Sequence, residues 1–400
     1  MSVEDVGALI QLLVACDGHC EALLLLSGSL PADDVESLAQ EARIDMIVSD
    51  RTDLHSARPV SEVLEMAPGQ PGSSITPCKT EWIMTTSGTT GRPKMISHTL
   101  ESLSRTVSRP TEGAQQNIWG LVYDPTRFAG MQVVLQSLLG GGVLVVSSPQ
   151  DSMGQRLALF GNEGITHLSA TPTLWRRFLM QPEISSLALR QITLGGEIAD
   201  QTILDALHRQ FSDARIVHIY ASTELGVGFS VKDLREGFPA AWLDQAPGSI
   251  AMRITEGTLR IKAATTSAAS GAEQQMAPDD DGYLDTQDTV EKIGGRVLFR
   301  GRDNGTVNIG GVKIYPETVE QILNARPEVM ISHVFSKKNP FSGNILIAEV
   351  VISPGIDNEA DLKTDLLRHC RDKLPKEAVP ALIRVVPDII LNPAGKVRRS

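Results

Sequence analysis

Hydrophobic and polar positions alternate in two ways along the first part of the chain. Short apolar runs predict strands buried in a sheet, and longer segments with one apolar face predict helices that cover it. The predicted strands are residues 45–49, 165–169, 192–194 and 216–219, and the predicted helices are residues 35–42, 173–180 and 200–211. Strands that alternate with helices in this way are typical of an α/β fold.

The longest apolar stretch, residues 130–146, is interrupted by three glycines at positions 140–142. The stretch is too short for a helix that spans a membrane. We expect a buried helix that turns at the glycines into a buried strand at residues 143–146.

The pattern changes after about Gly248. Short alternating runs at residues 258–262 and 296–299 predict antiparallel strands, and the small, polar and acidic residues 263–281 predict an exposed loop between them. Farther along, a separate compact unit is predicted. Its helices are residues 316–323 and 359–374, and its strands are residues 345–352 and 382–386.

A chain of 400 residues exceeds what one hydrophobic core usually organises, so we expect two domains. The first, residues 1–302, combines α/β sheets with a small antiparallel β subdomain. The second, residues 303–400, is predicted to be a small α+β domain. A hydrophobic content of 42% suits globular domains of this size and excludes a disordered chain.

The charge balance and the cysteine content limit the classes of protein to which the chain can belong. Aspartate and glutamate outnumber lysine and arginine by 48 to 37, which argues against a nucleic-acid binder. The first residues have no signal-peptide layout, so we expect a cytoplasmic protein without a membrane span, whose four cysteines stay reduced. Cys16, His19 and Cys20 lack the second ligand pair that a zinc site needs.

The densest local motif is residues 85–94, Thr-Thr-Ser-Gly-Thr-Thr-Gly-Arg-Pro-Lys, which follows a short apolar run. Gly88 and Gly91 let the backbone approach a ligand closely, and hydroxyl groups, backbone N–H groups and Lys94 suit a polyphosphate. The Gly-Lys-Ser/Thr ending of a Walker loop is missing. The alternative is a surface turn rich in glycine and threonine.

This segment resembles the phosphate-binding loop of the adenylate-forming (AMP-forming) superfamily, which includes acyl-CoA synthetases, nonribosomal peptide adenylation domains and firefly luciferase. Five further segments recur in the family's order, so the resemblance runs from about Leu23 to the end of the chain. They are residues 195–197, 220–224, 285–288, 301–314 and 392–396. The region before the phosphate loop is shorter than in typical members.

The resemblance implies four catalytic residues. Lys94 would hold the leaving pyrophosphate, Thr223 would contact a phosphate, and Glu224 would help to hold Mg²⁺. Lys396 would bridge the substrate carboxylate and the α-phosphate of ATP. A carboxylate beside phosphates is unfavourable unless a hard cation lies between them, which agrees with the metal role of Glu224.

The resemblance also implies a set of nucleotide-binding residues. Tyr220 would pack against the adenine, and Asp288 and Arg302 would contact the ribose. The full predicted set is Thr86, Ser87, Gly88, Thr89, Thr90, Gly91, Gly196, Glu197, Tyr220, Ala221, Ser222, Asp288 and Arg302. For residues 195–197 alone, a plain strand-to-helix turn is an equal alternative.

The second domain would swing about a hinge at Asp303, and Gly311 would line a tunnel for a thiol. Two positions depart from the family's pattern. Gln287 replaces a glycine, which puts the local backbone geometry in question, and Asn308 replaces a lysine, which removes a basic contact.

The predicted activity is that of an AMP-forming ligase. It would activate a carboxylic acid with ATP and pass the acyl group to CoA or to the phosphopantetheine of a carrier protein. An amino-acid-activating adenylation enzyme and a catalytically weak nucleotide-binding homologue are the alternatives. Asp124 could pair with a substrate ammonium and Arg127 with a second carboxylate, or both could be surface residues. We favour a non-amino acid, and whether the chain forms a homodimer stays open.

Overall fold

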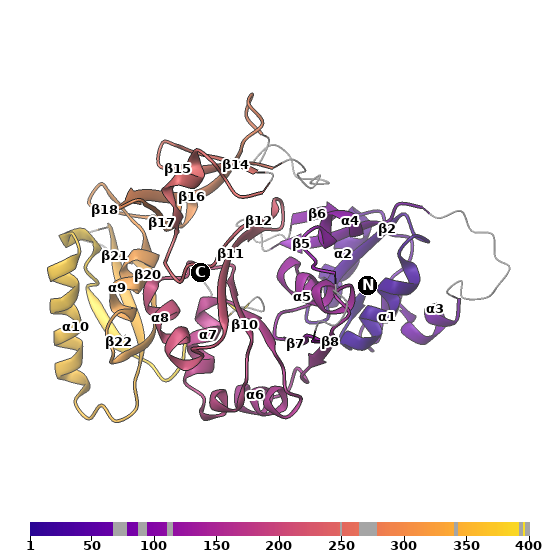
Figure 1. Ribbon diagram of the computed structural model, residues 1–400, viewed down its shortest axis with the longest axis horizontal. Coiled ribbons are helices and arrows are strands. Elements are labelled where there is room, and N and C mark those ends of the chain that lie inside the picture. Colours follow the sequence, from indigo (N-terminus) through magenta and orange to yellow (C-terminus); the bar gives the residue numbers. More distant parts are fainter. Residues whose placement is uncertain are drawn as a thin grey trace. The chain divides into compact units, whose positions relative to one another are not determined.

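The computed structural model describes residues 1–66, 78–86, 94–109, 115–248, 250–263, 278–339, 343–391 and 395–396. These residues form two compact units (Figure 1). Unit 1 holds the described residues up to Val146 together with residues 221–227. Unit 2 holds the remaining described residues, from Ser147 onward.

Unit 1 is built on a sheet whose strands follow the order β4-β3-β1-β2-β5-β6. Neighbouring strands are parallel except β5 and β6, which are antiparallel. The strands are β1 (Ser2–Val3), β2 (Ala22–Ser27), β3 (Val48–Ser49), β4 (Arg58–Pro59), β5 (Glu81–Thr86) and β6 (Lys94–His98). A parallel pair, β7 (Ile118–Leu121) and β8 (Val143–Val146), belongs to the same unit.

Helices cover both faces of strand β2, which explains its unbroken apolar sequence. Leu23 and Leu25 belong to a core cluster with α1, and Leu24 and Leu26 belong to another with α2. Successive side chains of a strand point to opposite faces, so a strand covered on both sides needs apolar residues throughout. The helices of unit 1 are α1 (Val6–Cys16), α2 (Ala32–Glu41), α3 (Val60–Met66), α4 (Leu100–Ser104) and α5 (Phe128–Leu138).

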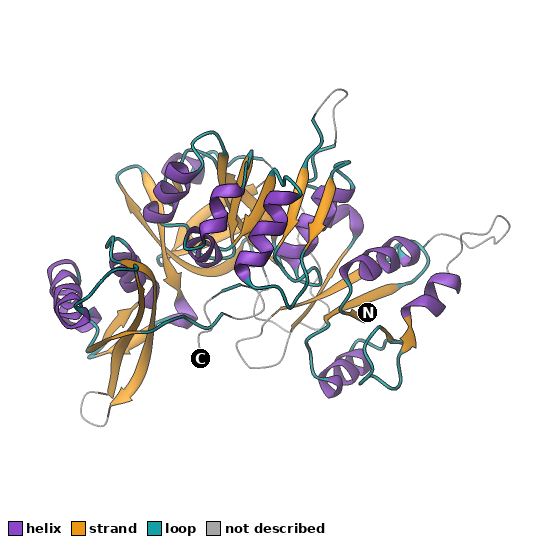
Figure 2. Cartoon of the chain, turned by 90° about the horizontal axis from the view of Figure 1, so that it is seen from below, coloured by secondary structure: helices purple, strands orange, loops and turns teal. Residues whose placement is uncertain are grey.

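Unit 2 begins with parallel strands and the helices that connect them (Figure 2). Asp200 caps α8 by accepting a hydrogen bond from the backbone N–H of Ile203 and forms a buried ion pair with Arg176 of α7. The elements are α6 (Met153–Asn162), β9 (His167–Ala170), α7 (Pro172–Leu179), η1 (Pro182–Ser186), β10 (Gln191–Gly195), α8 (Gln201–Gln210) and β11 (Arg215–Ser222).

An antiparallel sheet follows in the order β13-β17-β16-β15-β14. The elements of this stretch are β12 (Gly226–Val231), β13 (Phe238–Pro239), η2 (Ala240–Leu243), β14 (Ile250–Thr255), β15 (Thr258–Ala263), β16 (Leu284–Ile293) and β17 (Arg296–Arg302). The antiparallel strands predicted at residues 258–262 and 296–299 are therefore confirmed.

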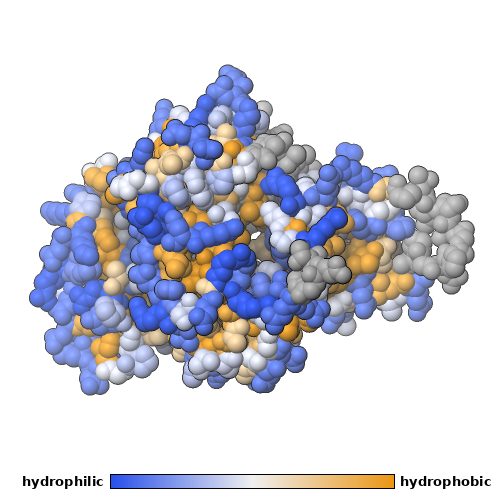
Figure 3. All heavy atoms as spheres, in the orientation of Figure 1, coloured by the Kyte–Doolittle hydropathy of each residue, from blue (hydrophilic) through white to orange (hydrophobic). Residues whose placement is uncertain are grey.

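The last part of unit 2 packs two helices on a three-stranded sheet, β20-β21-β22. Helix α10 buries Leu362, Leu366 and Cys370 at intervals of four, and the surface over α10 is hydrophilic (Figure 3). The elements are η3 (Asp303–Gly305), β18 (Val307–Ile309), β19 (Val312–Ile314), α9 (Pro316–Asn324), β20 (Val329–Asn339), β21 (Gly343–Ile352), α10 (Glu359–Lys373), η4 (Lys376–Ala378) and β22 (Leu382–Val385).

Three expectations about elements need correction. The strand predicted at residues 45–49 shortens to β3, and β8 is not buried, since Val143 and Val146 are 42% and 38% exposed. Strand β20, the longest in the described part of the chain, was missed. Most of the loop predicted at residues 263–281 lies outside the described residues, and the boundary at residue 303 stays a prediction.

Membrane-spanning helices and metal-binding clusters are both absent from the described residues. No described helix has the length and apolar character needed to cross a membrane. Within the same residues, no cluster of three or more histidine, cysteine, aspartate or glutamate side chains could hold a metal ion. All four cysteines are free.

Candidate active site

The predicted phosphate loop lies between the two antiparallel strands β5 and β6. Its ends are adjacent, because Thr86 pairs with Lys94 in the β ladder. The residues predicted between them, Ser87, Gly88, Thr89, Thr90 and Gly91, lie outside the described residues. Strand pairing thus fixes both ends of the loop at one edge of the unit 1 sheet.

His98, at the end of β6, is a site residue that the sequence analysis missed. Its side chain is 4% exposed and hydrogen-bonds to the backbone of Thr223. Burial lowers the pKa of His98 to about 4, although the Thr223 contact and the charge of Glu224 oppose the shift. The imidazole is therefore neutral near pH 7. The available signal was the spacing from Lys94, since residues four apart lie on one face of a strand.

Arg127 joins this group from the start of α5. Its guanidinium donates a hydrogen bond from Nη1 to the carbonyl oxygen of Thr85 at 2.6 Å. Burial lowers the pKa of Arg127, and nearby Asp124 opposes that shift. Asp124 Oδ1 accepts hydrogen bonds from the N–H and the hydroxyl of Thr126. Arg127 is tied to the strand that leads into the phosphate loop and is not a surface loop residue.

In unit 2, Tyr220, Asp288 and Arg302 form one polar group. The Tyr220 hydroxyl donates to Asp288 Oδ2 at 2.5 Å, and Arg302 Nε donates to Asp288 Oδ1 at 3.2 Å. Asp288 and Arg302 are partners in the β16–β17 ladder. Burial and the charge of Asp288 raise the pKa of Tyr220 well above its usual value. The carboxylate is therefore held from both sides by donors.

The aromatic surroundings of Tyr220 concern its predicted contact with the adenine. Its ring stacks nearly parallel to Phe229 and Phe299, with ring centroids 5.1 and 5.3 Å away. Tyr220 therefore already contacts other protein groups through both its ring and its hydroxyl. Packing of an adenine on Tyr220 stays a prediction.

Gln287, in the position of a family glycine, adopts the backbone conformation that glycine favours. Its φ is +59°, in the left-handed region. Its N–H donates to Asp285 Oδ1, and its side-chain oxygen accepts a hydrogen bond from Asn304. Gln287 therefore keeps the backbone geometry that a glycine would adopt at this position. Because it is not a glycine, it does so with backbone strain.

Gly196 and Lys396 lie against each other although two hundred positions separate them. Gly196 has φ +81°, and a Cβ added there would stand 2.9 Å from Lys396 Cε and 3.3 Å from Nζ. Neighbouring Glu197 accepts a hydrogen bond from the backbone N–H of Thr173, in the first turn of α7. Residues 195–197 thus make a strand-to-helix turn whose glycine leaves room for Lys396.

The remaining predicted residues lie at the end of β11 and around the η3–β19 stretch. Ser222 Oγ accepts a hydrogen bond from the Leu225 N–H, and Ala221 lies beside it in β11. The carboxylate of Asp303 pairs with Lys313 at 2.9 Å, and the N–H of Gly311 donates to Asn308 Oδ1. Asn308 therefore stabilises the β18–β19 turn. The hinge at Asp303 and the tunnel at Gly311 stay predictions.

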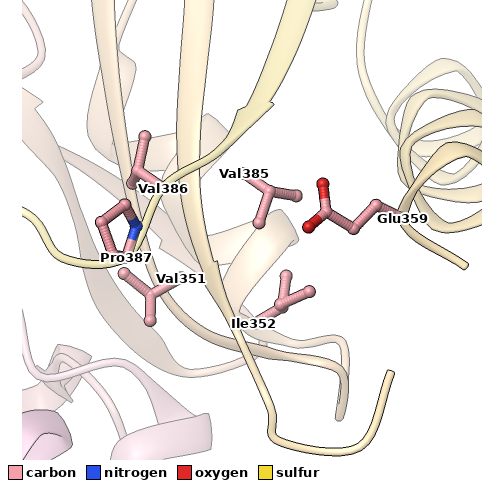
Figure 4. A pocket seen from close by; sticks show the side chains of 6 residues that line it. All are labelled: Val351, Ile352, Glu359, Val385, Val386 and Pro387. Carbon is pink, nitrogen blue, oxygen red and sulfur yellow. The ribbon is translucent and has the colours of Figure 1, made fainter. Parts of the chain in front are cut away.

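A cavity in unit 2 lies apart from these groups (Figure 4). Its apolar lining comes from β21 and from β22 with the residues after it, and the carboxylate of Glu359 faces it. The lining residues are Val351, Ile352, Glu359, Val385, Val386 and Pro387. This lining includes none of the predicted site residues and no basic side chain, so the cavity does not suit phosphates.

Comparison with known proteins agrees with this geometry. The model of the AMP-binding enzyme family matches residues 13–270, and that of the AMP-binding enzyme C-terminal domain matches residues 318–396. The chain belongs to the AMP-binding enzyme family. The predicted membership of the adenylate-forming superfamily is confirmed.

Relatives of this family are distant in sequence and close in fold. The chain is 25% identical to surfactin synthase subunit 1 of Bacillus subtilis over 80% of its own length, but spans only 10% of that protein. It is 26% identical to the 2-succinylbenzoate–CoA ligase of Salmonella typhimurium, over 78% of the chain and 66% of the ligase.

The crystal structure of ATP-bound MatB from Rhodopseudomonas palustris matches with a TM-score of 0.79 at 19% identity. The matched region covers 99% of this chain and 86% of MatB. The predicted α/β fold class, with a large N-terminal domain followed by a small C-terminal domain, is confirmed.

Proposed function

We propose that this AMP-binding family member is an AMP-forming ligase. It activates a carboxylic acid with ATP to an acyl-adenylate and then passes the acyl group to a thiol. The observation that carries the proposal is the position of Lys396 against Gly196, beside the strand-to-helix turn that resembles the family's Gly-Gly-Glu loop. Binding alone would not need this lysine.

In the first step, an oxygen of the substrate carboxylate attacks the α-phosphorus of ATP. The bond from the α-phosphorus to the bridging oxygen breaks, and pyrophosphate leaves with the electron pair. Two anionic groups approach each other, so positioning and charge stabilisation dominate the catalysis. Lys396 would neutralise the approaching oxygens, and Lys94 would hold the departing pyrophosphate.

Glu224 fits a magnesium ion. Its carboxylate is half-buried beside His98, which is neutral near pH 7 and so adds no full positive charge. A hard carboxylate oxygen is the ligand type that Mg²⁺ prefers. When bound, the ion would screen the phosphate oxygens from one another. Thr223, whose backbone His98 contacts, would be held next to this carboxylate.

Asp288 would hold the nucleoside through the ribose hydroxyls. Its two oxygens already accept from Tyr220 and Arg302, and each carboxylate oxygen has a second lone pair for a ligand. The protein donors orient the carboxylate, so that it can accept both ribose hydroxyls.

We propose a non-amino acid as the substrate. Asp124, the residue that could pair with an ammonium group, lies near the positive charge of Arg127 and uses one oxygen in its own turn. Both features weaken its attraction for an ammonium. Arg127 would instead favour an acid with a second polar or anionic group.

The thiol acceptor is CoA or the phosphopantetheine of a carrier protein. Asp303 and Gly311 support a thiol-transfer step only through their resemblance to the family's hinge and tunnel. Use of ATP and the free cysteines both fit the cytoplasm, which we propose as its location.

The test is exchange of labelled pyrophosphate into ATP with a panel of acyl, aryl, dicarboxylic and amino acids. We expect exchange with at least one non-amino acid, and its loss by about a hundredfold or more in Lys396→Ala. ATP binding without exchange for any acid would contradict the ligase and favour the weak nucleotide-binding homologue. Exchange confined to amino acids would contradict the substrate class. Adding CoA or a carrier protein then identifies the acceptor.

A further inference from the structure

Helix α7 carries one ridge of side chains that all contact the C-terminal part of the chain. The ridge consists of Thr171, Leu174, Arg177 and Met180, where Thr171 and Met180 are the N-cap and C-cap residues of the helix. Residues three apart form an oblique row on a helix surface, and such a row can pack along another segment. We call these four residues the α7 ridge.

The polar members of the α7 ridge bind backbone and side-chain groups of residues 386–391 and 395–396, which we call the C-terminal segment. The Thr171 hydroxyl donates to the carbonyl oxygen of Gly395 at 2.5 Å and accepts from the Leu174 N–H at 3.1 Å. Arg177 donates to the carbonyl oxygen of Ile389 and pairs with Asp388. One hydroxyl thus caps α7 and holds the C-terminal segment.

The apolar members of the α7 ridge pack on the same segment. Met180 packs on the cluster of Ile331, Val351 and Ile389, and Leu174 lies beside Gly395. The C-terminal segment therefore passes Met180 and Arg177 first and reaches Leu174 and Thr171 last, antiparallel to the helix.

This alignment delivers Lys396 to Gly196. Thr171 Cγ2 would lie 3.9 Å from a Cβ on either Gly196 or Gly395, so the threonine lies between the two glycines. Gly395 has φ +70°, a conformation that glycine adopts without strain, and the chain turns there directly before the lysine.

We propose that the α7 ridge is the docking site that holds the C-terminal segment in place for adenylation, with Thr171 as a positioning residue for Lys396. The assignment to adenylation rests on the proposed function, whereas the docking does not. Two hydrogen bonds and one ion pair with an exposed partner hold the segment loosely, because each such bond changes an equilibrium by only about fivefold. A docking of this strength can be released for a second step.

The first experiment compares the two half-reactions in Thr171→Val. We expect pyrophosphate exchange to fall by about tenfold, since two hydrogen bonds of the hydroxyl are lost. Thioester formation from a supplied acyl-adenylate should stay within twofold of the wild type. Thr171→Ser should restore the exchange. Ser152→Ala is the matched control, because Ser152 caps α6 in the same unit through an equivalent side-chain bond.

Equal losses in both half-reactions, a wild-type rate in Thr171→Val, or the same loss in Ser152→Ala would each overturn the positioning role. If Thr171→Val does not fold, Arg177→Gln takes its place. That variant removes the pairing with Asp388 and leaves the cap of α7 intact.

The second experiment needs no activity. Hydrogen exchange of peptides covering residues 386–396 should be about fivefold faster in Arg177→Gln than in the wild type, and unchanged in Ser152→Ala. Unchanged exchange in Arg177→Gln would overturn the docking. Wild-type protein that exchanges no pyrophosphate but shows this difference would contradict the proposed function and leave the docking intact.

Discussion

Tyr220→Phe removes one oxygen atom and keeps the ring that stacks on Phe229 and Phe299. Among the described residues, two side chains donate to the Asp288 carboxylate. One is the lost hydroxyl, and the other is Arg302, whose side chain is 59% exposed. Asp288 is itself only 15% exposed and gains little from water. The substitution therefore frees one oxygen of the carboxylate predicted to bind the ribose.

The size of the effect follows from the type of bond. A hydrogen bond to an ionised group contributes about 1.5–3 kcal/mol, and the middle of that range corresponds to roughly 45-fold in an equilibrium constant. If Asp288 binds the ribose hydroxyls, part of this energy orients it for the nucleotide. We expect the Kd for an ATP analogue to rise by about tenfold to thirtyfold.

Calorimetric titration with a non-hydrolysable ATP analogue measures the change directly. Phe299→Leu is the control, since it alters the stack on Tyr220 and keeps the hydroxyl. It should lower Tm and have little effect on the Kd for the nucleotide. A Kd in Tyr220→Phe within twofold of the wild type would show that the hydroxyl does not position Asp288 for a nucleotide.

Three further predictions concern single residues. Gly196→Ala should lower pyrophosphate exchange by about a hundredfold, because the new methyl group would displace Lys396, whereas Gly257→Ala, with φ +78° and open space around it, should exchange normally. Gln287→Gly should keep or raise Tm, since relief of about 1–2 kcal/mol of backbone strain offsets the greater freedom of glycine in the unfolded chain; a clear fall in Tm would contradict this. The folded pKa of His98 is lowered to about 4, below the unfolded value near 6.5, so stability should be full above pH 6.5 and fall by about 3 kcal/mol towards pH 4. Urea unfolding of His98→Gln should show a flatter pH dependence, and an unchanged slope would refute the assignment.

Elements with a strong local pattern could be predicted from the sequence. Helix α7 (Pro172–Leu179) overlaps the helix predicted at residues 173–180, and strand β10 contains the strand predicted at residues 192–194. Strand β20 was missed because Ser332 and His333 interrupt its apolar positions and its last residues are polar. The apolar run of β8 predicted burial, but apolar residues also occur at the surface, so composition alone does not place a strand.

Motifs indicated which residues carry chemistry, but not which neighbours hold them. The contact of His98 with Thr223 joins a strand end to a turn far along the chain, and no local pattern encodes it. The same applies to Tyr220 and Asp288, whose bond spans 68 positions. Such pairs depend on the packing of whole elements.

Thr171 shows how a local signal can conceal a distant role. In the sequence it is the threonine before Pro172, a common start of a helix, and that role is real because its oxygen accepts from the Leu174 N–H. The same hydroxyl has one proton to donate, and a buried donor needs an acceptor. Gly395 supplies that acceptor from the far end of the chain. Satisfying one buried hydroxyl therefore ties the start of α7 to the residue before Lys396, so a capping residue also positions the candidate catalytic lysine.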